Sequence, residues 1–87
     1  MPAGKLSTHI YATTYPNNTL TEFTLAGTVV RTITINLDVP QGVAVDSKGK
    51  IYVANYSGNT ITTYTLKGAT SKPTITGLTG VTGVAVH

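Results

Sequence analysis

The 87-residue sequence contains no cysteine and no tryptophan, and it has only three acidic residues. The absence of cysteine excludes a disulfide framework and a thiolate metal site. Charged residues are only 10% of the chain against 40% hydrophobic residues, so disorder through excess charge is not expected. No apolar run is long enough to span a bilayer, and no charged-then-apolar leader opens the chain. We therefore expect one small soluble unit with no membrane partner and no assigned compartment; an extracellular or periplasmic parent protein is left open.

Charged residues are scarce, and threonine is common instead, at about a fifth of the chain. Its β-branched side chain suits pleated, half-exposed strands. No stretch has helical periodicity, and the many threonines and nine glycines disfavour helix. The composition therefore predicts an all-β fold.

The sequence contains two copies of one unit, offset by 41 residues. A repeat with a period of about 40 residues is typical of proteins built from stacked structural units. The chain thus forms a single segment, 1–87, with repeat 1 at about 5–45 and repeat 2 at about 46–86. The aligned pairs include Ile10 and Ile51, Tyr15 and Tyr56, Asn18 and Asn59, Leu25 and Leu66, and Gly42 and Gly83.

Each unit contains short strand patterns separated by turn residues. The second copy reads GVAV (42–45), IYVAN (51–55), TITTYTL (60–66) and a weaker strand at about 74–78. The first copy repeats the series with HIYAT (9–13), TLTEFTL (19–25) and RTITINL (31–37). Four antiparallel strands in about 40 residues are typical of a β-propeller blade.

The text PQGVAVDSKGKIYVAN (40–55), followed by NTITTY (59–64), resembles an NHL-type repeat. It is also similar to the YVTN and SMP-30-like propeller repeats. The resemblance runs from about residue 9 to residue 86 and specifies a propeller blade better than it separates these families. The first copy departs from the pattern at Thr13 and Thr14, where the second has Ala54 and Asn55. A role for Asn55 is therefore not available in both blades.

The resemblance implies a strand identity for each segment. The segment 42–45 is the innermost strand A, 51–55 is strand B, 60–66 is strand C, and the weak strand is the outermost strand D. The chain then reads B-C-D, A-B-C-D and a last A at 83–86. The first blade lacks its inner strand, and the last strand lacks its blade.

Two blades cannot close a ring, and an unpaired strand is an aggregation hazard. A head-to-tail arrangement, in which 83–86 of one chain completes the first blade of the next, solves both problems. We expect a homotrimer with six blades, or alternatively a homotetramer with eight. A fragment excised from a longer propeller is the alternative interpretation, and it too needs partners. The expected interface residues are His9, Ile10, Tyr11, Gly83, Val84, Ala85, Val86 and His87.

The loops between strands B and C, and between D and the next A, share one face of such a ring. Aromatic faces beside amide groups suit small polar ligands such as glycans. The competing interpretation is that asparagines in these turns bond their own backbone and tyrosines pack between blades. The candidate ligand-binding residues are Tyr15, Asn17, Asn18, Gln41, Asn55, Tyr56 and Asn59.

The six basic residues are expected on the opposite, bottom side of the ring, and the net charge is +3. Such a surface attracts anionic polymers, and the resemblance to NHL propellers implies RNA binding in some members. No aromatics are interleaved with the lysines, and exposed turns are where lysine serves solubility, so a nucleic-acid partner is not expected. The basic residues are Lys5, Arg31, Lys48, Lys50, Lys67 and Lys72.

Two histidines offer a weak metal candidate. His9 and His87 would face each other across a turn shared by two subunits, and paired imidazoles bind transition metals. Because two imidazoles without a carboxylate make a poor site, no metal and no other cofactor is expected.

The sequence favours a non-catalytic binding or structural scaffold. SMP-30-like lactonases carry acidic metal ligands at the centre of the top face, whereas the acids of this chain are Glu22, Asp38 and Asp46, of which only Asp38 is expected there. No paired carboxylates or Ser-His-Asp arrangement is evident. A fragment of a lactonase-like or lyase-like propeller enzyme, or a surface-layer or adhesive structural protein, are the alternatives.

Overall fold

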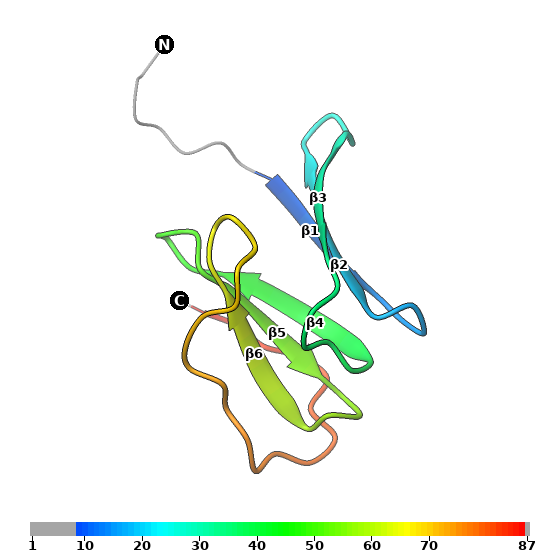
Figure 1. Ribbon diagram of the computed structural model, residues 1–87, viewed down its shortest axis with the longest axis vertical. Coiled ribbons are helices and arrows are strands. Elements are labelled where there is room, and N and C mark those ends of the chain that lie inside the picture. Colours follow the sequence, from blue (N-terminus) through cyan, green and yellow to red (C-terminus); the bar gives the residue numbers. More distant parts are fainter. Residues whose placement is uncertain (1–8, 87) are drawn as a thin grey trace.

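The computed structural model describes residues 9–86, which form two three-stranded antiparallel sheets (Figure 1). The first sheet has the order β1 (His9–Thr14), β2 (Thr19–Thr24) and β3 (Val29–Ile33). The second has the order β4 (Pro40–Val45), β5 (Ile51–Asn55) and β6 (Thr60–Tyr64). The described residues contain no helix able to cross a membrane. The all-β fold class is confirmed.

Equivalent turns show that the two copies share their backbone geometry. Gly27 and Gly68 both lie in the left-handed region, at φ 90° and 92°. The amides of both donate to a threonine carbonyl, Thr24 and Thr65, over 2.9 Å. Glycine is required there because a side chain strains this conformation. The 41-residue period of the sequence is thus a structural period as well.

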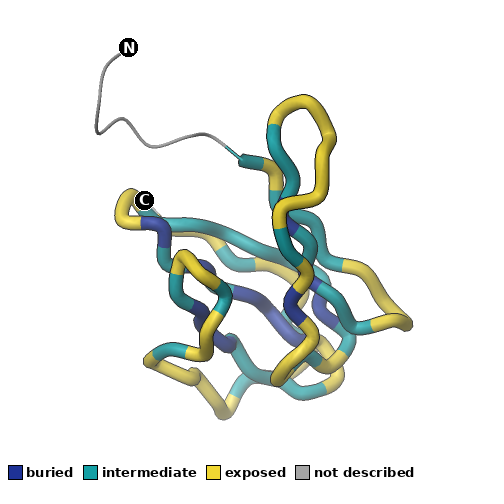
Figure 2. Tube along the Cα trace, turned by 45° about the horizontal axis from the view of Figure 1, so that its top comes forward, coloured by how far each residue is buried: buried dark blue, intermediate teal, exposed yellow. Residues whose placement is uncertain are grey.

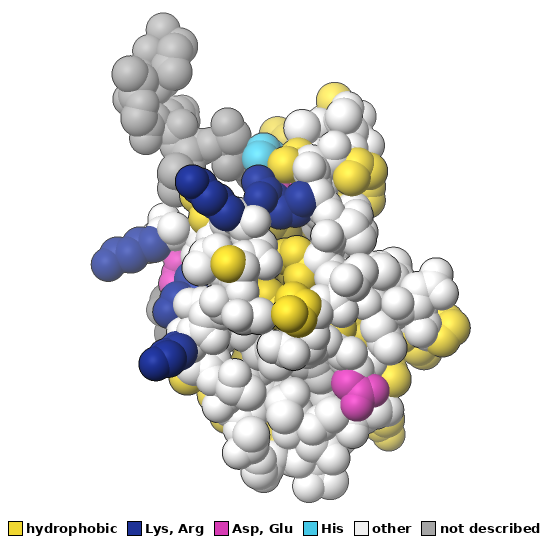
Figure 3. Space-filling model, viewed as in Figure 1, with side chains coloured by type: hydrophobic (Ala, Val, Ile, Leu, Met, Phe, Trp, Pro, Cys, Tyr) yellow, Lys and Arg dark blue, Asp and Glu magenta, His cyan; other side chains and the backbone are white. Residues whose placement is uncertain are grey.

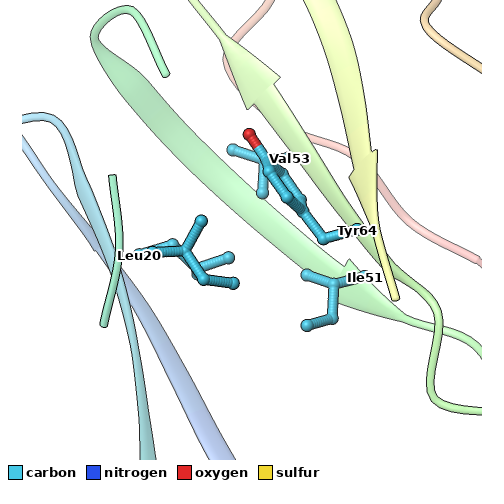
Figure 4. Close-up of a cluster of buried hydrophobic side chains, with 5 residues drawn as sticks. Leu20, Ile51, Val53 and Tyr64 are labelled. Atoms are coloured by element: carbon cyan, nitrogen blue, oxygen red, sulfur yellow. The ribbon is translucent and has the colours of Figure 1, made fainter. Parts of the chain in front are cut away.

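The core lies between the two sheets, where the buried residues concentrate (Figure 2). Side chains alternate between the faces of a strand, so each sheet turns one face to the other sheet. Leu20 of the first sheet points toward Ile51 and Tyr64 of the second (Figure 4). The buried hydrophobic cluster consists of Leu20, Ile33, Ile51, Val53 and Tyr64.

The fourth, outer strand that the sequence predicted for the second repeat does not form as a continuous strand. In place of a strand at 74–78, the segment after β6 makes two isolated bridges, Ile61 with Ile75 and Tyr64 with Thr70. Lys72, Pro73 and Gly77 interrupt it: proline has no amide to donate, and Gly77 has a φ of 81°. The second sheet therefore has three strands where the sequence predicted four, whereas the first sheet has the three strands that the sequence predicted for it. The third strand of the first sheet begins at Val29, two residues earlier than predicted.

The last described residues, 83–86, form no strand, although the sequence predicted one. They pass behind the second sheet (Figure 1). A β-carbon added to Gly42 of β4 would lie 2.9 Å from the Cα atom of Gly83, so the two backbones are in direct contact. A strand requires a hydrogen-bonded partner. Within residues 9–86 this segment has none, which explains why its strand-like sequence is not a strand here.

Candidate functional site

Among residues 9–86, the inner edge of the first sheet has no partner strand. Strand β1 pairs there only with β2, whereas its equivalent in the second sheet, β5, pairs with β6 on one side and with β4 on the other. The first sheet thus lacks the inner strand that β4 supplies to the second. His9, Ile10 and Tyr11, which the sequence assigned to an interface, lie on this unpaired edge strand.

The sequence places a copy of the missing strand at the other end of the chain. Val84 and Val86 correspond to Val43 and Val45 of β4. Through Gly83, the segment lies against the face of the second sheet that is turned away from the first. Val86 is 40% exposed. His87, the last predicted interface residue, lies outside the described residues.

Two of the candidate ligand-binding residues, Asn18 and Asn59, instead hydrogen-bond one loop to another. We call the surface formed by the candidate ligand-binding residues the candidate ligand face. The side-chain oxygen of Asn18 accepts from the amide of Val39 over 2.8 Å. Asn59, 41 residues later, accepts from the amide of Gly80 over 2.9 Å. Both asparagines have a positive φ, 57° and 53°, which asparagine tolerates better than most residues. Their observed role is to tie the turn between strands B and C of a blade, which is β1–β2 in the first sheet and β5–β6 in the second, to the segment that leaves that blade.

A chain of buried polar groups connects the second sheet to the segment that leaves the first. Asn55 is fully buried; its side-chain oxygen accepts from the amide of Asp38 over 3.1 Å, and its side-chain amide donates to Thr62 over 3.0 Å. The hydroxyls of Thr62 and Tyr64 are 3.0 Å apart, and Tyr64 donates to the carbonyl of Ile35 over 2.8 Å. Burial raises the pKa of Tyr64 above its ordinary value. The hydrogen-bonding capacity of Asn55 is thus used inside the protein.

Three other candidate residues present free surface. Tyr15 is 58% exposed and Tyr56 is 45% exposed, and Asn17 beside Tyr15 is exposed as well. Gln41 lies half-buried in β4. The candidate ligand face therefore divides into anchoring residues and the exposed residues Tyr15, Asn17 and Tyr56.

A buried carboxylate lies between the sheets. Glu22 of β2 is 3% exposed and contacts the Nδ1 atom of His9. Arg31 of β3 donates from Nε to Glu22 over 2.8 Å and from a terminal nitrogen to the carbonyl of Lys67 over 2.7 Å. Burial, followed by the charge of Glu22, raises the pKa of Tyr11. Arg31 therefore ties the two blades together.

The pairing of Glu22 with Arg31 was not predicted from the sequence. The signal was present: Glu22 is a lone acid in a threonine-rich strand, in phase with Leu20, and Arg31 follows on the next strand. In an antiparallel hairpin such residues stand opposite each other, and Glu22 does pair with Arg31 across β2 and β3.

His9 has Glu22 as its partner. The proposed pairing with His87 lies outside the described residues. Within 9–86, no group of three histidine, cysteine or acidic side chains gathers in a way that could hold a metal ion.

The basic side chains of the described part gather toward one side of the molecule (Figure 3). Lys50 donates to the carbonyl of Lys72 over 2.7 Å, as Arg31 does to that of Lys67. Lys48 is exposed in the turn after β4. Lys5, the remaining member of the predicted basic surface, lies outside the described residues.

The three acids have separate surroundings. Asp46 accepts from the amides of Lys48 and Lys50, each over 2.9 Å, and from the hydroxyl of Tyr52 over 3.1 Å. These bonds, led by that from Lys50, lower the pKa of Asp46. Asp46 therefore closes the turn between β4 and β5. Asp38 is exposed in the segment between the sheets, and Glu22 is buried in the pair with Arg31.

The two face-to-face sheets, the 41-residue structural period and the repeated loop anchors define a propeller-type repeat segment. Residues 37–64 match the family model of the NHL repeat. The match spans β4, β5 and β6, and it confirms the resemblance of this segment to an NHL-type repeat. No curated protein matches the chain.

Proposed function

We propose that this chain is a non-catalytic propeller scaffold whose copies assemble head to tail into a closed ring. The observation that carries the proposal is the unpaired edge of β1, in a sheet that lacks the strand β4 provides to its twin. The missing strand is supplied by residues 83–86 of another copy. Addition of a strand to an open sheet edge is a common mode of protein association, because main-chain hydrogen bonds provide affinity.

The ring also gives the C-terminal segment a partner strand, which it lacks among residues 9–86. When 83–86 pairs with β1 of the next copy, it becomes a strand of a four-stranded first blade. Three copies would form six blades and four copies eight, and the trimer is preferred by similarity to six-bladed propellers with this repeat. Head-to-tail contacts of this kind close when the rotation per copy divides a full turn.

Native mass spectrometry of the full chain tests the ring. The expected result is three, or alternatively four, times the chain mass of 9.1 kDa. Removal of residues 83–87 should leave a folded monomer, since the edge of β1 would then find no strand. A monomeric full chain at micromolar concentration would overturn the proposal.

Binding of a small polar ligand is a second candidate function, favoured by the exposure of Tyr15, Asn17 and Tyr56. Exposed aromatic rings beside an amide offer one stacking surface and several hydrogen bonds. A glycan array should show a signal with the wild-type chain that the double variant Tyr15→Ala/Tyr56→Ala loses. Equal signals, or no signal with either protein, would leave the chain as a structural scaffold.

A further inference from the structure

We infer that the outward faces of the two sheets, one open and one only partly covered in a single chain, are partners for each other in different copies, with Ile61 of one copy packing against Phe23 of the next. This inference rests on the proposed ring and adds the side chains that hold it together. It concerns the faces of the sheets, whereas the open edge of β1 concerns only main-chain pairing.

The first uncovered face belongs to the sheet of β1, β2 and β3. Leu20 and Glu22 of β2 are buried toward the second sheet, so Phe23, which follows Glu22, points the other way. Phe23 stands opposite Ile10 of β1 and Val29 of β3. Ile10 is 46% exposed and Val29 is 56% exposed, which makes this outward face apolar and open.

The same positions of the second sheet are fully buried. Ile51 and Tyr64, which follow Ile10 and Phe23 by 41 residues, have no exposed surface because the first sheet covers them. An aliphatic and an aromatic residue thus recur at corresponding positions of the two repeats. The pair is fully buried in the second repeat, whereas in the first repeat Ile10 is exposed and Phe23 is only partly buried. The contact between the sheets of one chain is therefore a template for a contact between chains.

The second outward face belongs to the sheet of β4, β5 and β6, and it is already covered in part within the chain, where Ala54 and Thr63 are buried. In the contact between the two sheets of one chain, Tyr11 and Leu20 of the first sheet pack against the second. Their counterparts 41 residues later are Tyr52 and Ile61. Both counterparts are only partly buried. Gly83 already lies against the inner part of this face, where β4 lies in the template.

The counterpart of the buried carboxylate makes the second face better suited to an apolar partner. Thr63 takes the place of Glu22, and its hydroxyl donates to the carbonyl of Pro73 over 2.9 Å. Thr63 is 2% exposed in the single chain and carries no charge, so a second copy that packs against this face meets no buried carboxylate. A second copy of this chain is the occupant, because it brings the matching apolar face and the β1 edge together.

Two variants that each block one face test the inference. Phe23→Lys blocks the first face and Ile61→Lys the second, while Ala26→Lys adds the same charge at the exposed tip of the β2–β3 turn, where the second repeat itself has Lys67. Native mass spectrometry should show monomers for Phe23→Lys alone and for Ile61→Lys alone. Ala26→Lys should keep the wild-type mass.

Mixing the two blocked variants provides the decisive measurement. Each retains one intact face, and the two intact faces are complementary, so the mixture should form a 1:1 dimer that grows no further. Formation of this dimer also shows that both variants are folded. A conservative variant, Phe23→Tyr, should assemble at least as tightly as wild type, with a gain of about two- to tenfold if the new hydroxyl finds a carbonyl as Tyr64 does.

The outcomes separate this inference from the ring itself. If Phe23→Lys and Ile61→Lys keep the wild-type oligomer while deletion of 83–87 abolishes it, the ring stands and the face contact is overturned. A mixture that stays monomeric also overturns the face contact. A monomeric wild-type chain overturns both.

Discussion

Asn18 accepts a hydrogen bond of 2.8 Å from the backbone amide of Val39, and Asn59 makes the equivalent bond of 2.9 Å with Gly80. The same side chain at the same place in both repeats fixes where the chain leaves each blade. The path between consecutive blades therefore depends on one asparagine per blade.

Asn18→Ala should lower the free energy of unfolding by about 2 kcal/mol, because it removes a hydrogen bond and places alanine in the left-handed conformation. Asn18→Gly retains the backbone freedom and should cost only about 1 kcal/mol. Urea unfolding at fixed protein concentration measures both. Asn17→Ala, one residue away and exposed, is the matched control and should stay within about 0.5 kcal/mol of wild type. An equal loss in the control would contradict the anchoring role.

Arg31→Met should destabilise the chain by about 2 kcal/mol, because it leaves Glu22 buried with one partner fewer and removes the bond to the carbonyl of Lys67. The side chain of Arg31 is 35% exposed, and solvent screening limits the loss. The double variant Arg31→Met/Glu22→Leu should be more stable than Arg31→Met alone, since no buried carboxylate that has lost its arginine remains. Strictly additive losses in this thermodynamic cycle would show that the two side chains act independently.

Tyr64→Phe should cost about 1 kcal/mol at neutral pH, through loss of the hydrogen bond to the carbonyl of Ile35. Burial raises the pKa of Tyr64 in the folded chain, so its contribution is fully present below its ordinary value of 10.0 and is lost as the pH rises above it. The alkaline decline in stability should be shallower in Tyr64→Phe than in wild type. Tyr56→Phe, at an exposed position, should keep the wild-type stability at neutral pH.

Gly42→Ala should destabilise the chain by about 1–3 kcal/mol, because the added methyl group meets the backbone of Gly83 at 2.9 Å and Thr82 at 3.1 Å. Gly83→Ala is its matched counterpart, since a β-carbon there has no atom of the described residues within 4 Å. In dilute solution it should change the stability by no more than about 0.5 kcal/mol. In the proposed ring Gly83 meets Gly42 of the next copy, so Gly83→Ala should weaken assembly; wild-type assembly would contradict that contact.

The sequence predicted the parts of the fold that depend on local pattern. Strand β5 was expected at Ile51–Asn55 and lies there, because turn residues bound it on both sides and its residues are β-branched, aromatic or small. The 41-residue period was visible because Gly and Asn recur where the backbone requires a positive φ, as at Asn18 and Asn59.

The sequence could not predict features that depend on a distant partner. GVAV forms a strand at 42–45 but not at 83–86, although the letters are identical, because only the first occurrence has β5 beside it. The pairing of His9 with Glu22 was likewise missed, because it depends on the register of β1 against β2. Asn55 is buried and forms hydrogen bonds inside the protein, whereas Asn17 is exposed to solvent. The residue type alone does not distinguish these two roles.

The contact between Gly42 and Gly83 has a consequence for the middle of a closed ring. If every inner strand contacts the next through a pair of glycines, the central axis is surrounded at the level of these glycines by main-chain atoms without side chains. The width of the opening then depends on the number of blades and hardly at all on side chains. A ring of eight blades would leave a wider aperture than a ring of six, so the size of solutes that pass through the centre would report the number of copies.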